Sequence, residues 1–127
     1  MLTIETKKGK EVVDITENIN SFLKEKDFKE GICCINVLHT TAALSTADLD
    51  PGTDLDMIDA FYEMIPKLNY RHPHDPEHVP DHILSAIIGS SLVLPVKNGK
   101  VILGTWQRAV LFEFDGPRKR SVAVTLK

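Results

Sequence analysis

The stretch ICCINVL, residues 32–38, decides how the fold is built. It is apolar at both alternating sets of positions except at Asn36, which is the pattern of a central strand covered on both faces. Gly31 precedes the stretch, and His39 follows it directly. The sequence therefore predicts a buried strand that ends at a histidine.

Upstream of this strand, the sequence predicts two strands and a helix. Residues 2–6 alternate apolar with polar side chains and residues 12–15 form a second short strand, so the glycine turn at residues 7–10 would join them as a hairpin. Thr16 suits the N-cap of a helix over residues 17–28, whose apolar side chains share one face.

Downstream, the strand runs into an aspartate-rich segment that is expected to be a loop. A helix follows over TDLDMIDAFYEMIP, residues 53–66, where Thr53 and Asp56 are spaced as in a capping box and the final proline stops the helix. Residues 69–82, NYRHPHDPEHVPDH, break all periodicity and predict an irregular loop, the kind of segment in which functional groups gather. A short helix then begins at Pro80 and ends at Gly89.

The last third of the chain reads as strands. Residues 91–96 lead into a type I′ turn at Asn98-Gly99, residues 101–114 continue as strand, DGPRK at residues 115–119 reads as a hairpin turn, and residues 121–126 complete the set. The element order ββαβααββββ over residues 1–127 predicts a single α+β domain with hairpins at both ends.

Composition limits the functions open to such a chain. At 127 residues, 43% hydrophobic and with a net charge of -3, the chain has the size and balance of one globular domain without a general electrostatic grip on nucleic acid. The adjacent cysteines, Cys33 and Cys34, point to opposite faces of a strand and read as reduced thiols. The sequence contains no signal-peptide pattern and no apolar run long enough for a bilayer, so a cytoplasmic protein without membrane contact is predicted.

Five histidines invite a metal-site interpretation, because neutral imidazole is the commonest protein ligand for zinc-like ions. His78 and His82 are four residues apart, but Pro80 is expected to hold the residue before it in an extended conformation, so the two would not share a helical face. For each histidine alone, a surface or capping role is the alternative. For His39 two interpretations stay open, a core histidine with satisfied nitrogens or a site residue beside Thr40 and Thr41.

Several blocks of the sequence together resemble the YjbQ-like family, UPF0047, and cover nearly the whole chain in the same order: LHTTAAL, YRH, the helix entry with His82, GSSLVLPVKNGKVILGTWQ and FEFDGPRKR. The resemblance implies a two-sheet sandwich with helices that assembles as a homotrimer. It also implies a secondary thiamine-phosphate synthase activity.

The resemblance also implies roles for individual residues. His39, His72 and His82 match the family's motif histidines and are the candidate ligands of a divalent metal ion, zinc-like by ligand type, with magnesium possible beside a phosphate substrate. Asp48 and Arg118 are the catalytic candidates. The candidates for substrate binding are hydroxyl donors and the GTWQ block, namely Thr40, Thr41, Ser90, Ser91, Thr105, Trp106 and Gln107.

One departure from the family pattern puts a role in doubt. Ala47-Asp48 stands where family members usually carry an Asn-Glu pair, so the acid is shorter and the amide is lost. Trp106 is expected either to stack on a heterocycle or to lie in the core. Glu113 is expected to be a paired carboxylate, with Arg118 as its partner.

Three functions follow as hypotheses. The first is a thiamine-phosphate synthase, which joins a thiazole phosphate to a pyrimidine diphosphate and releases pyrophosphate. The second is a metal-assisted enzyme acting on another phosphorylated small molecule. The third is a trimeric metal- or anion-binding protein without catalysis.

Overall fold

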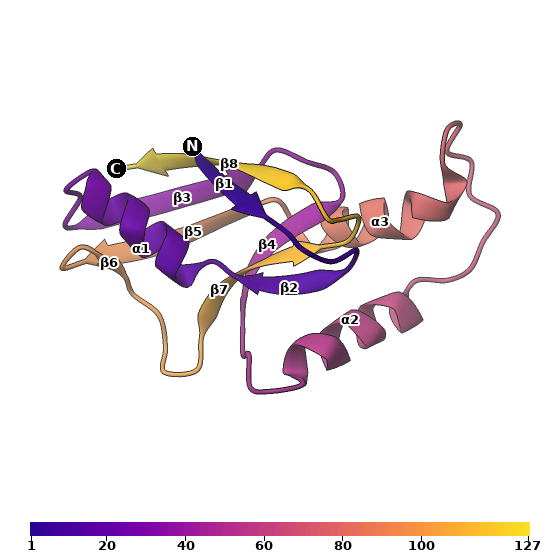
Figure 1. Ribbon diagram of the computed structural model, residues 1–127, viewed down its shortest axis with the longest axis horizontal. Helices are drawn as coiled ribbons and strands as arrows, with labels where there is room; N and C mark the ends of the chain where they lie inside the picture. The colour runs from indigo at the N-terminus through magenta and orange to yellow at the C-terminus, as the bar shows by residue number, and fades with distance from the viewer.

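The structure, a computed structural model, describes residues 1–127 as eight strands, three α-helices and one 3₁₀ turn (Figure 1). The strands are β1 (Leu2–Glu5), β2 (Glu11–Asp14), β3 (Gly31–Val37), β4 (Ala42–Ala47), β5 (Ser91–Lys97), β6 (Lys100–Val101), β7 (Arg108–Glu113) and β8 (Lys119–Leu126). The helices are α1 (Thr16–Glu25), α2 (Thr53–Met64) and α3 (Val79–Ile88), and the turn η1 (Pro76–His78) leads into α3. None of these helices has both the length and the apolar character needed to cross a membrane.

Two antiparallel sheets form the body of the protein. The larger has the order β1-β8-β3-β5-β6 and the smaller the order β2-β7-β4. One apolar core fills the space between the sheets and is closed at the side by Ile15, Ile19 and Leu23 at and within α1. A second core covers the other face of the smaller sheet, where α2 and α3 pack over Val110 and Phe112 (Figure 1). The predicted α+β class is confirmed.

The strand count differs from the prediction at one place. β4 occupies part of the segment that was expected to be a loop, and its first three residues, Ala42, Ala43 and Leu44, are buried through pairing with β7. Alanine has a low strand propensity, so this segment becomes a strand because it pairs with β7 and not because of a local signal. At residues 102–107 the structure has a loop between β6 and β7 where the sequence predicted a strand.

The two expected terminal hairpins are wrong. β1 pairs with β8 in the larger sheet, whereas β2 pairs with β7 in the smaller one. The glycine-containing links at residues 6–10 and 114–118 run side by side, joined by hydrogen bonds from Thr6 N to Arg118 O and from Gly116 N to Gly9 O. One antiparallel ribbon therefore bends from one sheet into the other, which local turn signals cannot distinguish from two hairpins.

A third crossing lies at the same end of the sandwich. Residues 38–41 carry the chain from β3 in the larger sheet to β4 in the smaller one. Phe114 N donates to Thr41 O, and Leu38 N donates to Ser121 O, so this crossing packs against the ribbon. His39, Thr40 and Thr41 thus lie where three connections meet.

The outer face of the larger sheet is uncovered. Ile32 on β3 is 48% exposed and Val93 on β5 is 58% exposed, whereas Cys33 and Ile35 point into the core. Within one chain, β3 is therefore covered on one face only, contrary to the expectation from its sequence. The Asn98-Gly99 turn is as predicted, with positive φ at both residues.

The helix starts differ in detail from the predictions. The side chain of Asp14 accepts from Thr16 N, so Asp14 rather than Thr16 supplies the acceptor at α1. Gly52, with φ of 90°, precedes α2, and Thr53 makes no side-chain cap. Val79 is helical rather than extended, so the expected conformation before Pro80 is wrong. Pro80 itself is tolerated because it lies in the first turn of α3, where a missing N–H costs nothing.

Candidate functional site

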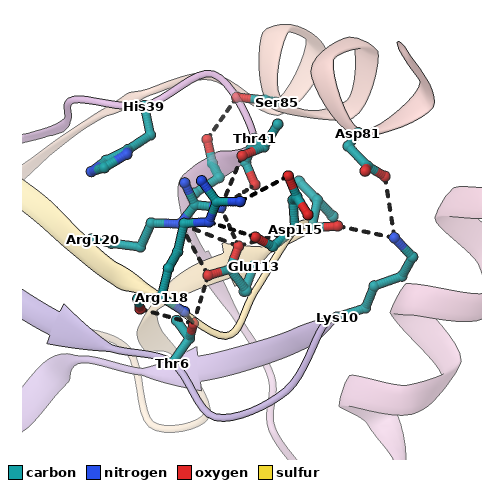
Figure 2. Close-up of polar contacts among 12 residues, drawn as sticks. Thr6, Lys10, His39, Thr41, Asp81, Ser85, Glu113, Asp115, Arg118 and Arg120 are labelled. Atoms are coloured by element: carbon teal, nitrogen blue, oxygen red, sulfur yellow. Dashed lines mark hydrogen bonds and ion pairs between the residues drawn. The ribbon is translucent and has the colours of Figure 1, made fainter. Parts of the chain in front are cut away.

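A buried cluster of polar side chains, hydrogen-bonded to one another, lies at the corner where the chain crosses from one sheet to the other. We call Thr6, Thr41, Glu113 and Arg120 the corner cluster (Figure 2). The side chains of Glu113 and Arg120 are 0% and 1% exposed, and Arg120 Nε lies 3.0 and 3.2 Å from the two carboxylate oxygens of Glu113. Thr6 Oγ1 donates to Glu113 Oε1 at 2.6 Å. Arg120 is therefore the partner of Glu113, and the expected pairing with Arg118 is wrong.

Thr41 belongs to this cluster and not to an open pocket. Arg120 Nη2 donates to Thr41 O at 3.0 Å and to Thr41 Oγ1 at 2.9 Å. Burial alone would raise the pKa of Glu113, but hydrogen bonds from Arg120, Thr6 and the Asp115 amide outweigh it and lower the pKa below its usual value. The pair stays ionised, and every member is engaged within the protein, which indicates a structural role.

An open pocket lies beside the corner cluster, between the β3–β4 crossing and α3. Its volume is about 430 Å³, and it is lined by His39, Thr40, His82, Ser85, Ala86, Gly89 and Ser90. Ser85 Oγ donates to Ala42 O at 2.6 Å, which ties α3 to β4 and so fixes the helix that carries His82. The pocket brings together four of the predicted site residues, His39, Thr40, His82 and Ser90.

Three histidines at this end of the molecule are each anchored to the backbone through one ring nitrogen. Ser121 N donates to His39 Nε2 at 2.9 Å, and His82 Nδ1 lies 3.1 Å from Thr40 O. His72 Nδ1 accepts from the amides of residues 74 and 75 at 3.2 and 3.0 Å. The rings of His72 and His82 stack with their centroids 5.5 Å apart.

These anchors set the protonation of the remaining nitrogens. A backbone amide can only donate, so a neutral His39 carries its proton on Nδ1 and a neutral His72 on Nε2. A carbonyl can only accept, so His82 donates from Nδ1 and keeps a lone pair on Nε2. No buried side-chain nitrogen or oxygen lacks a partner, so the unanchored nitrogens reach solvent.

The surroundings of His39 favour its neutral form. Its pKa is lowered first by partial burial and then by the positive charges of Arg120 and Arg118. The ring is therefore an N–H donor at neutral pH.

The free ring nitrogens differ in what they could offer a metal ion. A metal ligand must offer an unprotonated nitrogen, and in this arrangement only His82 does so, since His39 and His72 use their lone pairs to accept from the backbone. No three His, Cys, Asp or Glu side chains are placed to hold one metal ion together. The metal site of His39, His72 and His82 stays a prediction.

The other predicted residues lie elsewhere. Asp48, Thr105 and Trp106 line a separate pocket of about 270 Å³ that also contains Arg108. Trp106 is 72% exposed, so the core interpretation of this residue is wrong.

Three further candidates are engaged by neighbouring groups. Gln107 Nε2 donates to Thr46 Oγ1 at 2.9 Å, and Ser91 Oγ donates to Asn36 Oδ1 at 2.6 Å. Arg118 Nη2 lies 3.0 Å from Asp115 Oδ2. The structure thus divides the predicted site into separate parts.

One network escaped sequence reasoning. The carboxylate of Asp81, only 4% exposed, accepts from Lys10 Nζ at 3.2 Å (Figure 2). It also accepts from Tyr62 OH at 2.7 Å and lies 2.6 Å from His78 Nδ1. The hydrogen bond to Asp81 raises the pKa of His78, and burial raises that of Tyr62. Nothing local in the sequence indicates a contact between Lys10 and Asp81, which are 71 residues apart.

Comparisons with known proteins cover the whole chain. The profile of the family described as "UPF0047 protein YjbQ-like" matches residues 1–127. A UPF0047 protein of Methanocaldococcus jannaschii is 40% identical over 97% of this chain and 89% of its own length. The UPF0047 protein YugU of Bacillus subtilis is 36% identical over 98% of this chain and 96% of its own length.

Solved structures agree with this match. An uncharacterised conserved protein of the YjbQ/UPF0047 family from Clostridium acetobutylicum superposes with a TM-score of 0.87 at 30% identity, over 98% of this chain and 97% of that one. A hypothetical protein from Aeropyrum pernix gives a TM-score of 0.89 at 32% identity, over 98% and 94% of the two chains.

Proposed function

Since the chain belongs to the YjbQ-like family UPF0047, we propose that it is an enzyme that binds a phosphorylated small molecule in the pocket of His39, Thr40, His82 and Ser90, with thiamine-phosphate synthesis as its reaction. The observation that carries the proposal is that His39 and His82 line one open pocket while the backbone holds each of their rings. Rigid anchoring with a free nitrogen is what a ligand-binding imidazole needs.

The reaction defines what the pocket must do. The thiazole ring nitrogen forms a bond to the methylene carbon of the pyrimidine while the bond from that carbon to the diphosphate oxygen breaks, so pyrophosphate leaves with the bonding electrons. Hydrogen-bond donors aimed at the departing oxygens stabilise this charge. His39 Nδ1–H and the hydroxyls of Thr40 and Ser90 supply such donors.

A divalent metal ion remains a prediction. Magnesium bound to a diphosphate would neutralise charge on the leaving group, and His82 Nε2 is the ring nitrogen available to a zinc-like ion. His39 and His72 use their unprotonated nitrogens to accept from backbone amides, so in this arrangement neither offers a lone pair to such an ion.

Assembly as a homotrimer is part of the proposal. The uncovered face of the larger sheet carries Ile32 and Val93, both about half exposed, and a second copy of the chain would remove this apolar surface from water. The unbridged thiols of Cys33 and Cys34 fit a cytoplasmic protein. Light scattering at micromolar concentration tests the assembly, and a monomer mass would contradict it.

A non-catalytic anion-binding protein is the second candidate. The observation that favours it is that none of the residues lining the histidine pocket is an aspartate or glutamate, so the pocket lining supplies no carboxylate as a general base. In this case the protein would bind pyrophosphate without forming thiamine phosphate.

The deciding experiment pairs complementation with an assay of the purified protein. Cells that lack thiamine-phosphate synthase are expected to grow when they carry the wild type or His74→Ala, a control at an exposed histidine, and not when they carry His82→Ala. The purified wild type should release pyrophosphate from the two substrates. Absence of both growth and release, with pyrophosphate still bound, would favour the second candidate.

A further inference from the structure

We infer that His39 recognises a phosphoryl oxygen as a neutral hydrogen-bond donor through Nδ1–H, in a tautomer that the Ser121 amide imposes, and that it is not a metal ligand. The inference deepens the proposed function and rests on it. It names the chemical class recognised by the pocket, a phosphate ester or diphosphate, and assigns opposite tautomers to the two pocket histidines.

The first support is the geometry of the anchor. Ser121 lies on β8, between β1 and β3 in the larger sheet, where it pairs with Thr3 and its carbonyl accepts from Leu38 N. Its amide donates to His39 Nε2 at 2.9 Å. Rotation of the ring or a change of tautomer would break this hydrogen bond and leave the amide of Ser121 without its acceptor.

The second support is the contrast with His82. Its anchor is the carbonyl of Thr40, the residue next to His39, and that carbonyl requires a donor. Residues 39 and 40 thus position both rings. His39 presents the N–H of its Nδ1 to the pocket, whereas His82, held by the Thr40 carbonyl, presents the lone pair of its Nε2. A phosphate group offers oxygens that accept the first and, when protonated, a hydroxyl that donates to the second.

The third support is the chemistry of metal ligation. Nε2 of His39 already accepts from the Ser121 amide, so a metal ion could bind only at Nδ1. Ligation there would require the ring to lose the proton that Nδ1 carries. A phosphoryl oxygen accepts that proton as a hydrogen bond without removing it.

The test is the ring spectrum of the wild-type protein. In nitrogen-15 spectra of the imidazoles, we expect His39 to show a protonated Nδ1 and an unprotonated Nε2, and His82 to show the reverse. Inorganic pyrophosphate should shift the Nδ1 resonance of His39, whereas zinc ions should leave it unchanged. A protonated Nε2 on His39, a zinc-induced shift of its nitrogens, or no binding of pyrophosphate would overturn the inference.

Two variants sharpen the test. His39→Ala removes the donor and should weaken pyrophosphate binding by about tenfold or more. His39→Asn places an amide nitrogen one bond from Cγ, as Nδ1 is, and should recover part of the loss, while His74→Ala should bind like the wild type. Equal losses in His39→Ala and His39→Asn would contradict the donor role.

The experiments distinguish a failure of this inference from a failure of the proposed function. If the spectra and pyrophosphate binding are as expected and no thiamine phosphate forms, the inference stands and the synthase proposal fails. If thiamine phosphate forms and zinc binds to His39, the synthase proposal stands and the inference fails.

Discussion

The corner cluster and the histidine pocket are neighbours with opposite designs. In the corner cluster, Glu113 and Arg120 are shielded from water and each polar group has a partner inside the protein. In the pocket, each histidine is held through one nitrogen and leaves the other free. Thr41 serves the cluster and Thr40 holds His82, so two consecutive residues of one crossing serve the two regions.

The same division recurs on α3. Asp81 is buried and accepts from Lys10 and Tyr62, while the next residue, His82, faces the pocket. A polar side chain near a motif therefore indicates a binding site only if some of its hydrogen-bond donors or acceptors are not already used within the protein. A closed network stabilises the protein, whereas an anchored group with one free atom can meet a ligand.

The largest effect is expected where the corner cluster is broken. Arg120→Ala leaves Glu113 as an unpaired buried charge and should lower the free energy of unfolding by about 3–5 kcal/mol. Urea denaturation followed by circular dichroism measures this. Arg118→Ala is the matched control, since its exposed pair with Asp115 contributes about 0–1 kcal/mol. Equal effects of the two variants would contradict the closed design.

An intermediate effect is expected at Asp81. Asp81→Ala removes the acceptor that Lys10, Tyr62 and His78 share and should cost about 1–3 kcal/mol in unfolding free energy. Tyr62→Phe removes one donor and keeps the ring, so it should cost less than Asp81→Ala. If thermal melts rank the two variants in the reverse order, the carboxylate is not the centre of this network.

A smaller effect should follow pH through His78. Its pKa is raised above the ordinary value of about 6.5, chiefly by the hydrogen bond to Asp81. The folded state therefore holds the proton more tightly than the unfolded state, so this stabilisation is complete below about pH 6.5 and is lost as pH rises through the raised pKa. Urea midpoints of the wild type and His78→Gln should converge as the pH rises through that window. If the urea midpoints of the two proteins keep a constant difference at all pH values, the hydrogen bond between His78 and Asp81 does not contribute to stability.

The smallest effect on stability, with a large effect on binding, is expected in the pocket. His82→Ala removes a partly exposed ring with one hydrogen bond to Thr40 and should change the unfolding free energy by about 1 kcal/mol or less. Calorimetric titration with pyrophosphate should nevertheless show binding strongly weakened. A large loss of stability with unchanged pyrophosphate binding would show that His82 has a structural role and does not bind the ligand.

The sequence predicts the fold well where a pattern is local. The helices and most strands follow from periodicity, and the turn at Asn98-Gly99 follows from its residue types. The missing strand, β4, and the ribbon that bends between sheets depend on pairing with β7 and β8, which no local signal contains. Turn residues identify where the chain bends and not which sheet it enters.

The site is predicted in part. His39 and His82 share a pocket as their motifs suggest, because a strand end and a helix start are fixed by packing. The roles of Thr41 and Arg120 could not be predicted, since a hydroxyl and a guanidinium read the same in sequence whether they face a ligand or a buried partner. The Asp81 network lies beyond sequence reasoning for the same reason.

The ribbon that pairs β1 with β8 and β2 with β7 has a consequence for synthesis. Thr6 and Glu113 bond across 107 positions of sequence, so the corner cannot close while the last strands are still inside the ribosome. Until then, β1 lacks its sheet neighbour and one edge of β3 stays unpaired. Contacts of such long range form slowly. The emerging chain therefore carries open strand edges until β8 has been made, and pairing of β8 with β1 and β3 removes these edges, which would otherwise be open to aggregation.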